Sequence, residues 1–210
     1  MADYTLHCFL ESGNAYKPAL MLQLAGADWD AAFVDFMNGA NRSPEFRALN
    51  EMGEVPVLID HTQGDIVISQ SGVMLWHLAD RFDQFAARNA EEHREVLRWL
   101  LWDNHKFTGN LATFRFMHKF MGKGETPEAQ FAKARMIQAF KLLNRRLEER
   151  EWVAADRVTI ADLSLAGYCF WPDHYETDWN DYPNIKAWLG RIEALPNFAR
   201  PEDILPTSAA

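Results

Sequence analysis

The sequence predicts two domains of different class, an α/β domain of order βαβαββα followed by an all-helical bundle. Alternating runs of β-branched and aromatic residues, which are typical of strands, end at residue 69, and helical spacing of apolar residues takes over from residue 90. The chain has 210 residues, 48% of them hydrophobic, which is enough for two small cores. We therefore expect the α/β domain at residues 1–83, a linker at 84–90 and the helical domain at 91–210.

Each element of the α/β domain has a local signal. Ser43 and Pro44 are typical of the N-cap and the first position of a helix, and Gly26 is typical of a helix end. The last two strands form a hairpin around residues 61–64. In chain order the predicted strands are YTLHCFL, AAFVDF, VPVLI and DIVIS, and the predicted helices are ALMLQLAG, SPEFRALN and SGVMLWHLADRF.

The helical domain begins with a long pattern that has no obvious break. Helical spacing extends over residues 90–121, and a second helix is predicted over 127–150. Further along, VTIADLSLAG contains a capping box, in which the side chains of Thr159 and Asp162 each accept a hydrogen bond from the other residue's backbone N–H. The apolar residues around this box predict a buried helix, so we assign Asp162 to structure rather than to catalysis.

Composition and motif spacing exclude several functions. A formal net charge of -9 argues against general affinity for nucleic acid or anionic lipid. Cys8 and Cys169 are far apart and have no metal-ligand spacing, so we expect neither a disulfide nor a structural metal. The histidines show no metal-binding spacing, and neither a serine-hydrolase elbow nor a phosphate-binding P-loop is present. We identify no signal peptide or membrane span and expect a cytoplasmic protein.

Three separated segments carry polar groups that could meet at one end of the sheet: residues 12–17, 54–56 and 69–71. A cis Val55-Pro56 bond would turn the backbone N–H and carbonyl of Val55 outward, free to pair with an extended peptide. The third segment opens a predicted helix, whose N-terminus favours a carboxylate. Taken singly, each segment has a structural alternative, namely a trans proline, a helix cap or a turn. Taken together, they describe a site for a short anionic peptide.

The order of these segments resembles the cytosolic glutathione transferase superfamily over essentially the whole chain. The resemblance rests on LNEMGEVPVLID as the cis-proline motif, SQSGVMLWHLAD as the motif that grips a γ-glutamyl group, and VTIADLSLAG as the N-capping box. It implies a thioredoxin-like first domain, glutathione as cosubstrate, no metal, and a homodimer. It also implies a transferase of the detoxifying kind, in which the glutathione thiolate attacks an electrophilic small molecule.

The same resemblance assigns glutathione-binding roles to residues of the first domain. The backbone of Val55, which precedes Pro56, is expected to pair with the cysteinyl unit, and Gln70 and Ser71 are expected to hold the γ-glutamyl end. Asn41 is the first candidate for the glycyl carboxylate. Further polar side chains that the resemblance places around that carboxylate or the neighbouring backbone are those of Arg42, Lys17 and Glu54.

The opening loop determines the expected catalytic residues. Ser12 matches the serine position of theta-like and zeta-like members, and Asn14 resembles the asparagine of bacterial nu-like members, which act largely on disulfides. The loop departs from both patterns, since Gly13 stands between them. We expect the Ser12 hydroxyl and the Asn14 amide to stabilise the thiolate, neither acting as a base. Tyr16 is an alternative inside the first helical turn, and Cys8 is expected to be a buried residue of the first strand.

The second substrate is expected to contact the long helix of the second domain. Core packing is the alternative for its aromatic residues, and pairing with Asp103 is the alternative for its histidine. The candidates are Trp102, His105, Phe107 and Phe114. Three functions remain open at this point: conjugation of an electrophile, glutathione-dependent reduction of a disulfide, and glutathione binding without catalysis.

Overall fold

The computed structural model describes residues 2–208, which form two compact units. The first contains residues 2–84 and 195–208, and the second contains residues 85–194. The sequence therefore misplaces the segment after Ala194, which it assigns to the helical domain. That segment belongs to the first unit because the backbone N–H of Leu10 donates to the carbonyl of Pro206 at 2.9 Å and the Tyr16 hydroxyl donates to the carbonyl of Ala199 at 2.7 Å. The ends of the predicted ranges, residues 1, 209 and 210, lie outside the described residues.

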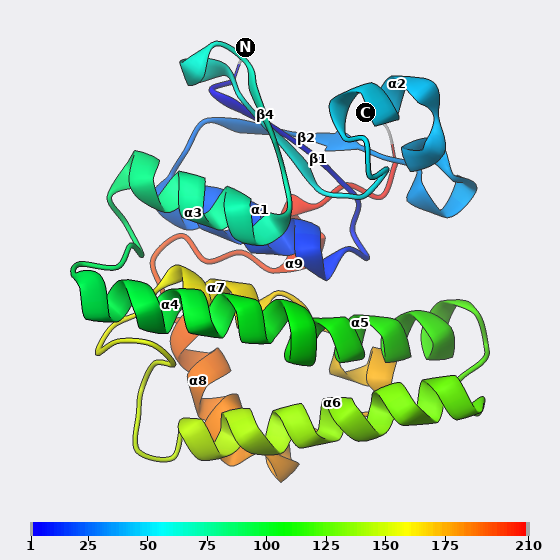
Figure 1. Ribbon diagram of the computed structural model, residues 1–210, viewed down its shortest axis with the longest axis vertical. Helices are drawn as coiled ribbons and strands as arrows, with labels where there is room; N and C mark the ends of the chain where they lie inside the picture. The colour runs from blue at the N-terminus through cyan, green and yellow to red at the C-terminus, as the bar shows by residue number, and fades with distance from the viewer. Residues whose placement is uncertain (1, 209–210) are drawn as a thin grey trace. The chain divides into compact units, whose positions relative to one another are not determined.

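The first unit is built on a mixed four-stranded sheet of order β2-β1-β3-β4 (Figure 1). Strand β1 pairs in parallel with β2, and β3 pairs antiparallel with both β1 and β4. The βαβαββα order predicted from the sequence is confirmed. The strands are β1 (Tyr4–Cys8), β2 (Trp29–Phe33), β3 (Val57–Asp60) and β4 (Ile66–Ser69).

Helices cover both faces of this sheet, because alternate side chains of β1 point in opposite directions. Helices α1 (Gly13–Ala25) and α3 (Ser71–Phe82) lie side by side on one face, where the Tyr4 ring meets Phe82 of α3 edge-on (Figure 1). His7 points to the other face and meets Phe46 of α2 (Pro44–Leu49). The remaining helical turns of this unit are η1 (Phe36–Asn38), η2 (Ala40–Arg42), η3 (His61–Gln63) and α9 (Pro201–Ile204).

Helix α1 begins earlier than the sequence pattern predicts. Its first residue is Gly13, not Ala19, because the Ser12 hydroxyl caps it by accepting from the Ala15 N–H at 3.1 Å. Pro18 lies inside the helix. The predicted end at Gly26 is confirmed, with that residue in the left-handed conformation at φ 67°.

The second unit is entirely helical among its described residues. The predicted helix over 90–121 is confirmed, because helical residues follow one another from Ala90 to Phe120. Two stretches within it, Asp103–Phe107 and Phe116–Phe120, are π-helical. Helix α6 ends at Arg146, earlier than the predicted Arg150, and packs along α5 (Figure 1). The elements are α4 (Ala90–Trp102), η4 (Asp103–Phe107), α5 (Thr108–Arg115), η5 (Phe116–Phe120), α6 (Pro127–Arg146), α7 (Ile160–Ala166), η6 (Pro172–Tyr175), η7 (Trp179–Asp181) and α8 (Pro183–Glu193).

The predicted capping box organises the centre of this unit. The buried Asp162 carboxylate accepts hydrogen bonds from the Thr159 backbone at 2.9 Å and from the indole of Trp188 at 3.0 Å. It also accepts from the backbone N–H of Val153 at 2.9 Å, which ties the segment before α7 to the helix. Every residue of α7 is buried, so the structural assignment of Asp162 is confirmed.

In residues 2–208, no helix has the length and apolar character that crossing a bilayer would need.

A second buried carboxylate stabilises the first unit at the end of β3. Asp60 has no exposed side-chain surface; it accepts from the Thr62 hydroxyl at 2.6 Å and pairs with the His77 ring on α3 at 2.7 Å. Burial alone would raise the pKa of Asp60, but the hydrogen bonds from Thr62 and His77 outweigh it and hold that pKa below its ordinary value.

We predict that Asp60→Asn lowers the free energy of unfolding at pH 7 by about 2 kcal/mol, because it weakens this hydrogen-bonded network. A carboxylate whose pKa is lowered by folding stabilises fully above its unfolded pKa of about 3.9, and that contribution is lost as pH falls through the folded value. The difference between variant and wild type should therefore shrink below about pH 4 in urea titrations. Asp65→Asn is the matched control, since Asp65 also pairs with a histidine but its side chain is 73% exposed. An effect of equal size in both variants would contradict the assignment.

Candidate functional site at one edge of the sheet

Strand register brings the three predicted segments to the same edge of the sheet. His7 at the end of β1 is paired with Val57 at the start of β3, which is paired with Ser69 at the end of β4. The residues that follow β1, precede β3 and follow β4 must therefore leave the sheet at this edge. These are the segments that contain Ser12, Val55 and Gln70, as the sequence predicts.

The N-terminus of α1 carries two polar groups with unused hydrogen-bonding capacity. The Ser12 hydroxyl oxygen accepts from Ala15, but its own hydrogen has no acceptor among the described residues. The Asn14 side-chain oxygen is buried and has no partner among those residues. No acidic residue lies in the first helical turn to offset the positive end of the helix dipole. This end of α1 is therefore suited to an anion.

The loop before β3 presents free backbone beside a cis peptide bond. The Val55-Pro56 bond is cis, as the sequence analysis expects, and the backbone N–H and carbonyl of Val55 form no hydrogen bond with the described residues. The amide of buried Asn50 donates to the Glu54 carbonyl at 2.8 Å and thereby holds the loop in place. Val55 can thus pair with an extended ligand, as a strand would.

The same loop requires Gly53. Its φ is 64°, and an added Cβ would lie 3.0 Å from the Asn41 carbonyl oxygen. The Asn41 amide, which the sequence analysis assigns to a carboxylate, is buried and donates to the Gly53 carbonyl at 2.6 Å. This hydrogen bond of Asn41 stabilises the loop before β3. Of the other two carboxylate candidates, Arg42 is exposed and Lys17 is buried in α1.

Sequence reasoning missed Asn50 and Gly53 as residues of this site. Asn and Gly three positions apart just before a Val-Pro step are a turn signal, so the NEMGEVP stretch could have identified them.

Gln70 and Ser71 lie at the N-terminus of α3. Gln70 has a φ of 67°, a strained conformation for a residue with a side chain, and its amide donates to the Glu54 carboxylate at 3.0 Å. No side chain caps α3, and its first turn contains no acid. Helix α2 differs, because the Ser43 hydroxyl accepts from its Phe46 N–H at 3.1 Å. The first N–H groups of α3 are thus available to a carboxylate.

Two other groups that could react, the Cys8 thiol and the Tyr16 hydroxyl, are buried in the fold. The Cys8 side chain is fully buried in β1, and burial raises the pKa of its thiol to about 12. The prediction that Cys8 behaves as a small hydrophobic residue is therefore confirmed. Tyr16 is also buried, with its hydroxyl bonded to Ala199, which removes it as an alternative to Ser12.

The four candidates for the second substrate differ in exposure, and the ring centres of two of them, Trp102 and Phe107, lie 5.8 Å apart. Phe107 and Phe114 are fully buried, and the Phe107 ring packs against Phe140, as core residues would. His105 is exposed on η4. Trp102 lines a cavity of about 340 Å³ between η4 and α6.

The fold and this edge of the sheet define a class of protein: a thioredoxin-like unit that gathers two helix N-termini and unpaired backbone, joined to an all-helical unit. Family models agree with both parts. The model of the glutathione S-transferase N-terminal domain matches residues 2–80, and that of the C-terminal domain matches residues 105–196. The chain belongs to the glutathione S-transferase family, which confirms the predicted resemblance.

Individual relatives cover nearly the whole chain. The solved structure of a possible glutathione S-transferase from Rhodopseudomonas palustris is 30% identical with a TM-score of 0.87, over 99% of this chain and 93% of that one. Disulfide-bond oxidoreductase YfcG of Escherichia coli is 25% identical over 201 residues, 90% of this chain and 89% of its own. The fold is also that of glutathione transferase URE2P8 from Phanerochaete chrysosporium, solved with oxidized glutathione, at 24% identity and a TM-score of 0.88 over 97% of this chain and 95% of that one.

We predict that Cys8 plays no part in the chemistry. Its thiol, with a pKa of about 12, should resist a chromogenic disulfide reagent at pH 8 in the folded protein and react once urea unfolds the chain. Cys8→Ala should keep the activity within about threefold, since it removes a buried group of modest volume. Rapid labelling of native Cys8, identified by peptide mass mapping, would contradict this.

Proposed function

We propose that this protein binds glutathione at the sheet edge and stabilises its thiolate with the Ser12 hydroxyl and the Asn14 amide. The observation that carries the proposal is the pair of unsatisfied groups at the N-terminus of α1, the Ser12 hydroxyl hydrogen without an acceptor and the buried Asn14 amide oxygen without a partner. The thiolate then attacks an electrophilic small molecule, in the manner of a detoxifying transferase.

The required stabilisation is modest. Lowering the pKa of a thiol from about 8.5 to about 6.5 takes about 2.7 kcal/mol of preferential interaction with the thiolate. A hydroxyl donor and an amide donor at a helix N-terminus are sufficient in kind and number for this. Rotation of the Asn14 amide exchanges its oxygen for its NH₂ group, which turns the unsatisfied acceptor into a donor.

The rest of the peptide has matching partners along the same edge. The free backbone of Val55 is suited to the cysteinyl unit, and the uncapped N-terminus of α3 with Gln70 and Ser71 is suited to the γ-glutamyl carboxylate. The carboxylate of Glu54, held 3.0 Å from the Gln70 amide, is suited to the ammonium group at that end.

A specific observation favours a second reaction, glutathione-dependent reduction of a disulfide. YfcG, whose name describes a disulfide-bond oxidoreductase, resembles this chain over 90% of its length, and Asn14 is present in the opening loop. In that reaction the stabilised thiolate attacks a disulfide sulfur and displaces a thiolate. Turnover of a halogenated nitroaromatic compared with turnover of a small disulfide separates the two reactions.

We predict that Ser12→Ala raises the pKa of the bound glutathione thiol toward about 8.5 and lowers kcat by about 10- to 100-fold, with a small effect on glutathione binding. Ultraviolet difference absorbance of the bound thiolate across pH measures the first effect. Steady-state assays with both substrates measure the second.

Ser43→Ala is the matched control for Ser12→Ala. Both serines cap a helix of the first unit with a 3.1 Å hydrogen bond, so both variants should lose about 1 kcal/mol of stability. Loss of the thiolate signal in the Ser12 variant alone supports the proposal. Glutathione binding without a shifted thiolate in the wild type would favour a non-catalytic binding protein instead.

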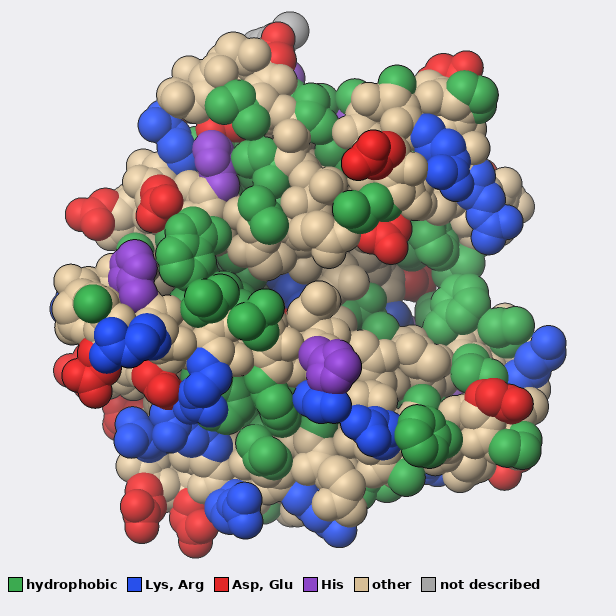
Figure 2. Space-filling model, in the orientation of Figure 1, with side chains coloured by type: hydrophobic (Ala, Val, Ile, Leu, Met, Phe, Trp, Pro, Cys, Tyr) green, Lys and Arg blue, Asp and Glu red, His purple; other side chains and the backbone are tan. Residues whose placement is uncertain are grey.

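We also propose that the helical unit forms a homodimer. Figure 2 shows hydrophobic side chains at the surface of this unit. Leu101 on α4 is exposed to 63% and Phe131 on α6 to 65%. Leu97 precedes Leu101 by one helical turn, so the two form an apolar strip on α4. A second copy of the chain, offering the same strip, is the occupant that fits.

We predict that Leu101→Glu shifts the protein from dimer to monomer at micromolar concentration in sedimentation velocity experiments, because the interface would bury an unpaired charge. Met121→Glu is the control, since Met121 is exposed to 46% but lies beyond the end of η5. A wild-type monomer, or dissociation by both substitutions, would overturn this interface.

The compartment proposed for the protein follows from its cysteines. Both are free and buried, which is compatible with a reducing cytoplasm. Such a compartment also supplies the glutathione that the proposed reaction consumes.

A further inference from the structure

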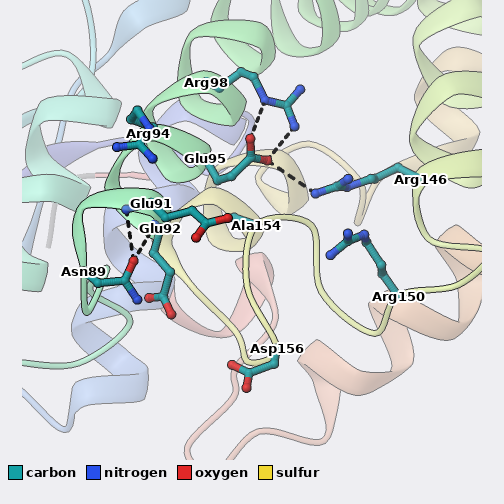
Figure 3. A pocket seen from close by; sticks show the side chains of 10 residues that line it. All are labelled: Asn89, Glu91, Glu92, Arg94, Glu95, Arg98, Arg146, Arg150, Ala154 and Asp156. Atoms are coloured by element: carbon teal, nitrogen blue, oxygen red, sulfur yellow. Dashed lines mark hydrogen bonds and ion pairs between the residues drawn. The ribbon is translucent and has the colours of Figure 1, made fainter.

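A polar cavity of about 600 Å³ lies within the helical unit. It is bounded by the N-terminal half of α4, the end of α6 and the segment after it, and Figure 3 shows the side chains that line it. Ala154 is the one lining residue without a polar side chain. The volume is that of a small-molecule site, and the lining excludes an apolar ligand.

Basic and acidic groups are separated inside this cavity. Arg98, Arg146 and Arg150 lie along one side, and Glu91 and Glu92 approach from the other (Figure 3). On the basic side three guanidinium groups face a single carboxylate, that of Glu95. The lining as a whole balances four arginines against four carboxylates, so positive charge is concentrated on this side of the cavity rather than in excess over all of it.

The shared carboxylate holds two of the guanidinium groups in fixed positions. Glu95 pairs with Arg98 at 2.6 Å and with Arg146 at 3.4 Å. Arg146 also donates to the Val153 carbonyl at 2.8 Å, and the guanidinium carbons of both arginines lie over the buried Trp99 ring, at 4.9 and 5.4 Å from its centre. In each arginine the bonds run through Nε and Nη2, so Nη1 has no partner among the described residues.

Arg150 supplies charge that the fold leaves unpaired. It is exposed and forms no ion pair or hydrogen bond with the described residues. Burial lowers the pKa of Arg146, and the neighbouring positive charge of Arg150 lowers it further. An anion placed among the three guanidinium groups would relieve this repulsion.

The acidic side of the cavity is largely engaged in the fold. Glu92 pairs with Arg157 at 2.7 Å, and Asp156 lies 3.6 Å from the same arginine. The Arg157 hydrogen bond and the backbone N–H of Arg88 hold the pKa of Glu92 at about 2, so this carboxylate stays ionised. Glu91 is exposed, and its carboxylate has no partner among the described residues, which leaves the carboxylate oxygens free to accept from hydroxyl groups.

We propose that this cavity binds a small phosphorylated molecule, with the phosphate held by Arg98, Arg146 and Arg150 and a hydroxyl-bearing body facing Glu91. Arginine forks match phosphate geometry, and the cavity is much larger than phosphate alone requires. The site is separate from the glutathione site and does not depend on the proposed reaction.

Isothermal titration calorimetry of the full chain tests this, with glucose 6-phosphate, inorganic phosphate, glucose and malonate as probes at constant ionic strength. We expect saturable binding of glucose 6-phosphate with a dissociation constant of about 1 mM or lower and no detectable binding of glucose. Weaker binding of inorganic phosphate than of glucose 6-phosphate would support the role of the hydroxyl-bearing body, and equal binding of the two would overturn it. Malonate binding as tight as that of glucose 6-phosphate would overturn the phosphate assignment.

Arg150→Gln and Arg94→Gln form a matched pair of variants. Both arginines line the cavity without a partner in the fold, but Arg94 is on α4, away from the shared carboxylate (Figure 3). We expect Arg150→Gln to weaken glucose 6-phosphate binding at least tenfold and Arg94→Gln by less than about threefold, with transferase turnover unchanged in both. Absence of saturable binding in the wild type, or equal binding in all three proteins, would overturn the proposal.

Discussion

The antiparallel pairing of β3 with both of its neighbours is the constraint on which the candidate site depends. Because β3 runs opposite to β1 and β4, its first residue lies where the other two strands end. Helices α1 and α3 start just beyond those ends, so both N-termini lie at one edge of the sheet, beside the Val55-Pro56 bond. A one-residue slip of β3 would turn Leu58 out of the core, and burial of that side chain therefore fixes the geometry of the site.

Polar groups at this edge lack hydrogen-bond partners, whereas comparable groups elsewhere in the first unit have them. An unpartnered, buried amide oxygen at Asn14 and a strained backbone at Gln70 each cost on the order of 1 to 3 kcal/mol. Elsewhere in the unit, polar groups such as the carboxylate of Asp60 and the amide of Asn50 are fully engaged. A fold that satisfies its buried groups in one place and leaves them unsatisfied in another identifies the place where a ligand completes the structure.

Local interactions explain what the sequence could predict. The caps at Ser43 and Thr159 join residues within four positions of each other, so their pattern is legible in a short stretch. The first residues of α1 were harder to predict, because the apolar run that marks the helix begins only at Ala19, whereas the helix itself begins at Gly13. The burial of Phe107 and Phe114 could not be settled, since helical spacing identifies an apolar face but does not say whether protein or ligand covers it. The cavity around Arg150 could not be predicted, because its lining residues come from α4 and from the end of α6, which are far apart in the sequence and share no short motif.

The return of the C-terminal segment to the first unit affects the order in which the chain can mature. The bonds from Leu10 to Pro206 and from Tyr16 to Ala199 join residues almost the full length of the chain apart. During synthesis, the helical unit is complete before those partners leave the ribosome, whereas the sheet unit must wait for them. The sheet edge that carries the candidate site, which includes the N-terminus of α1, therefore reaches its final support last. An interrupted translation product would contain a finished helical unit and an unfinished candidate site.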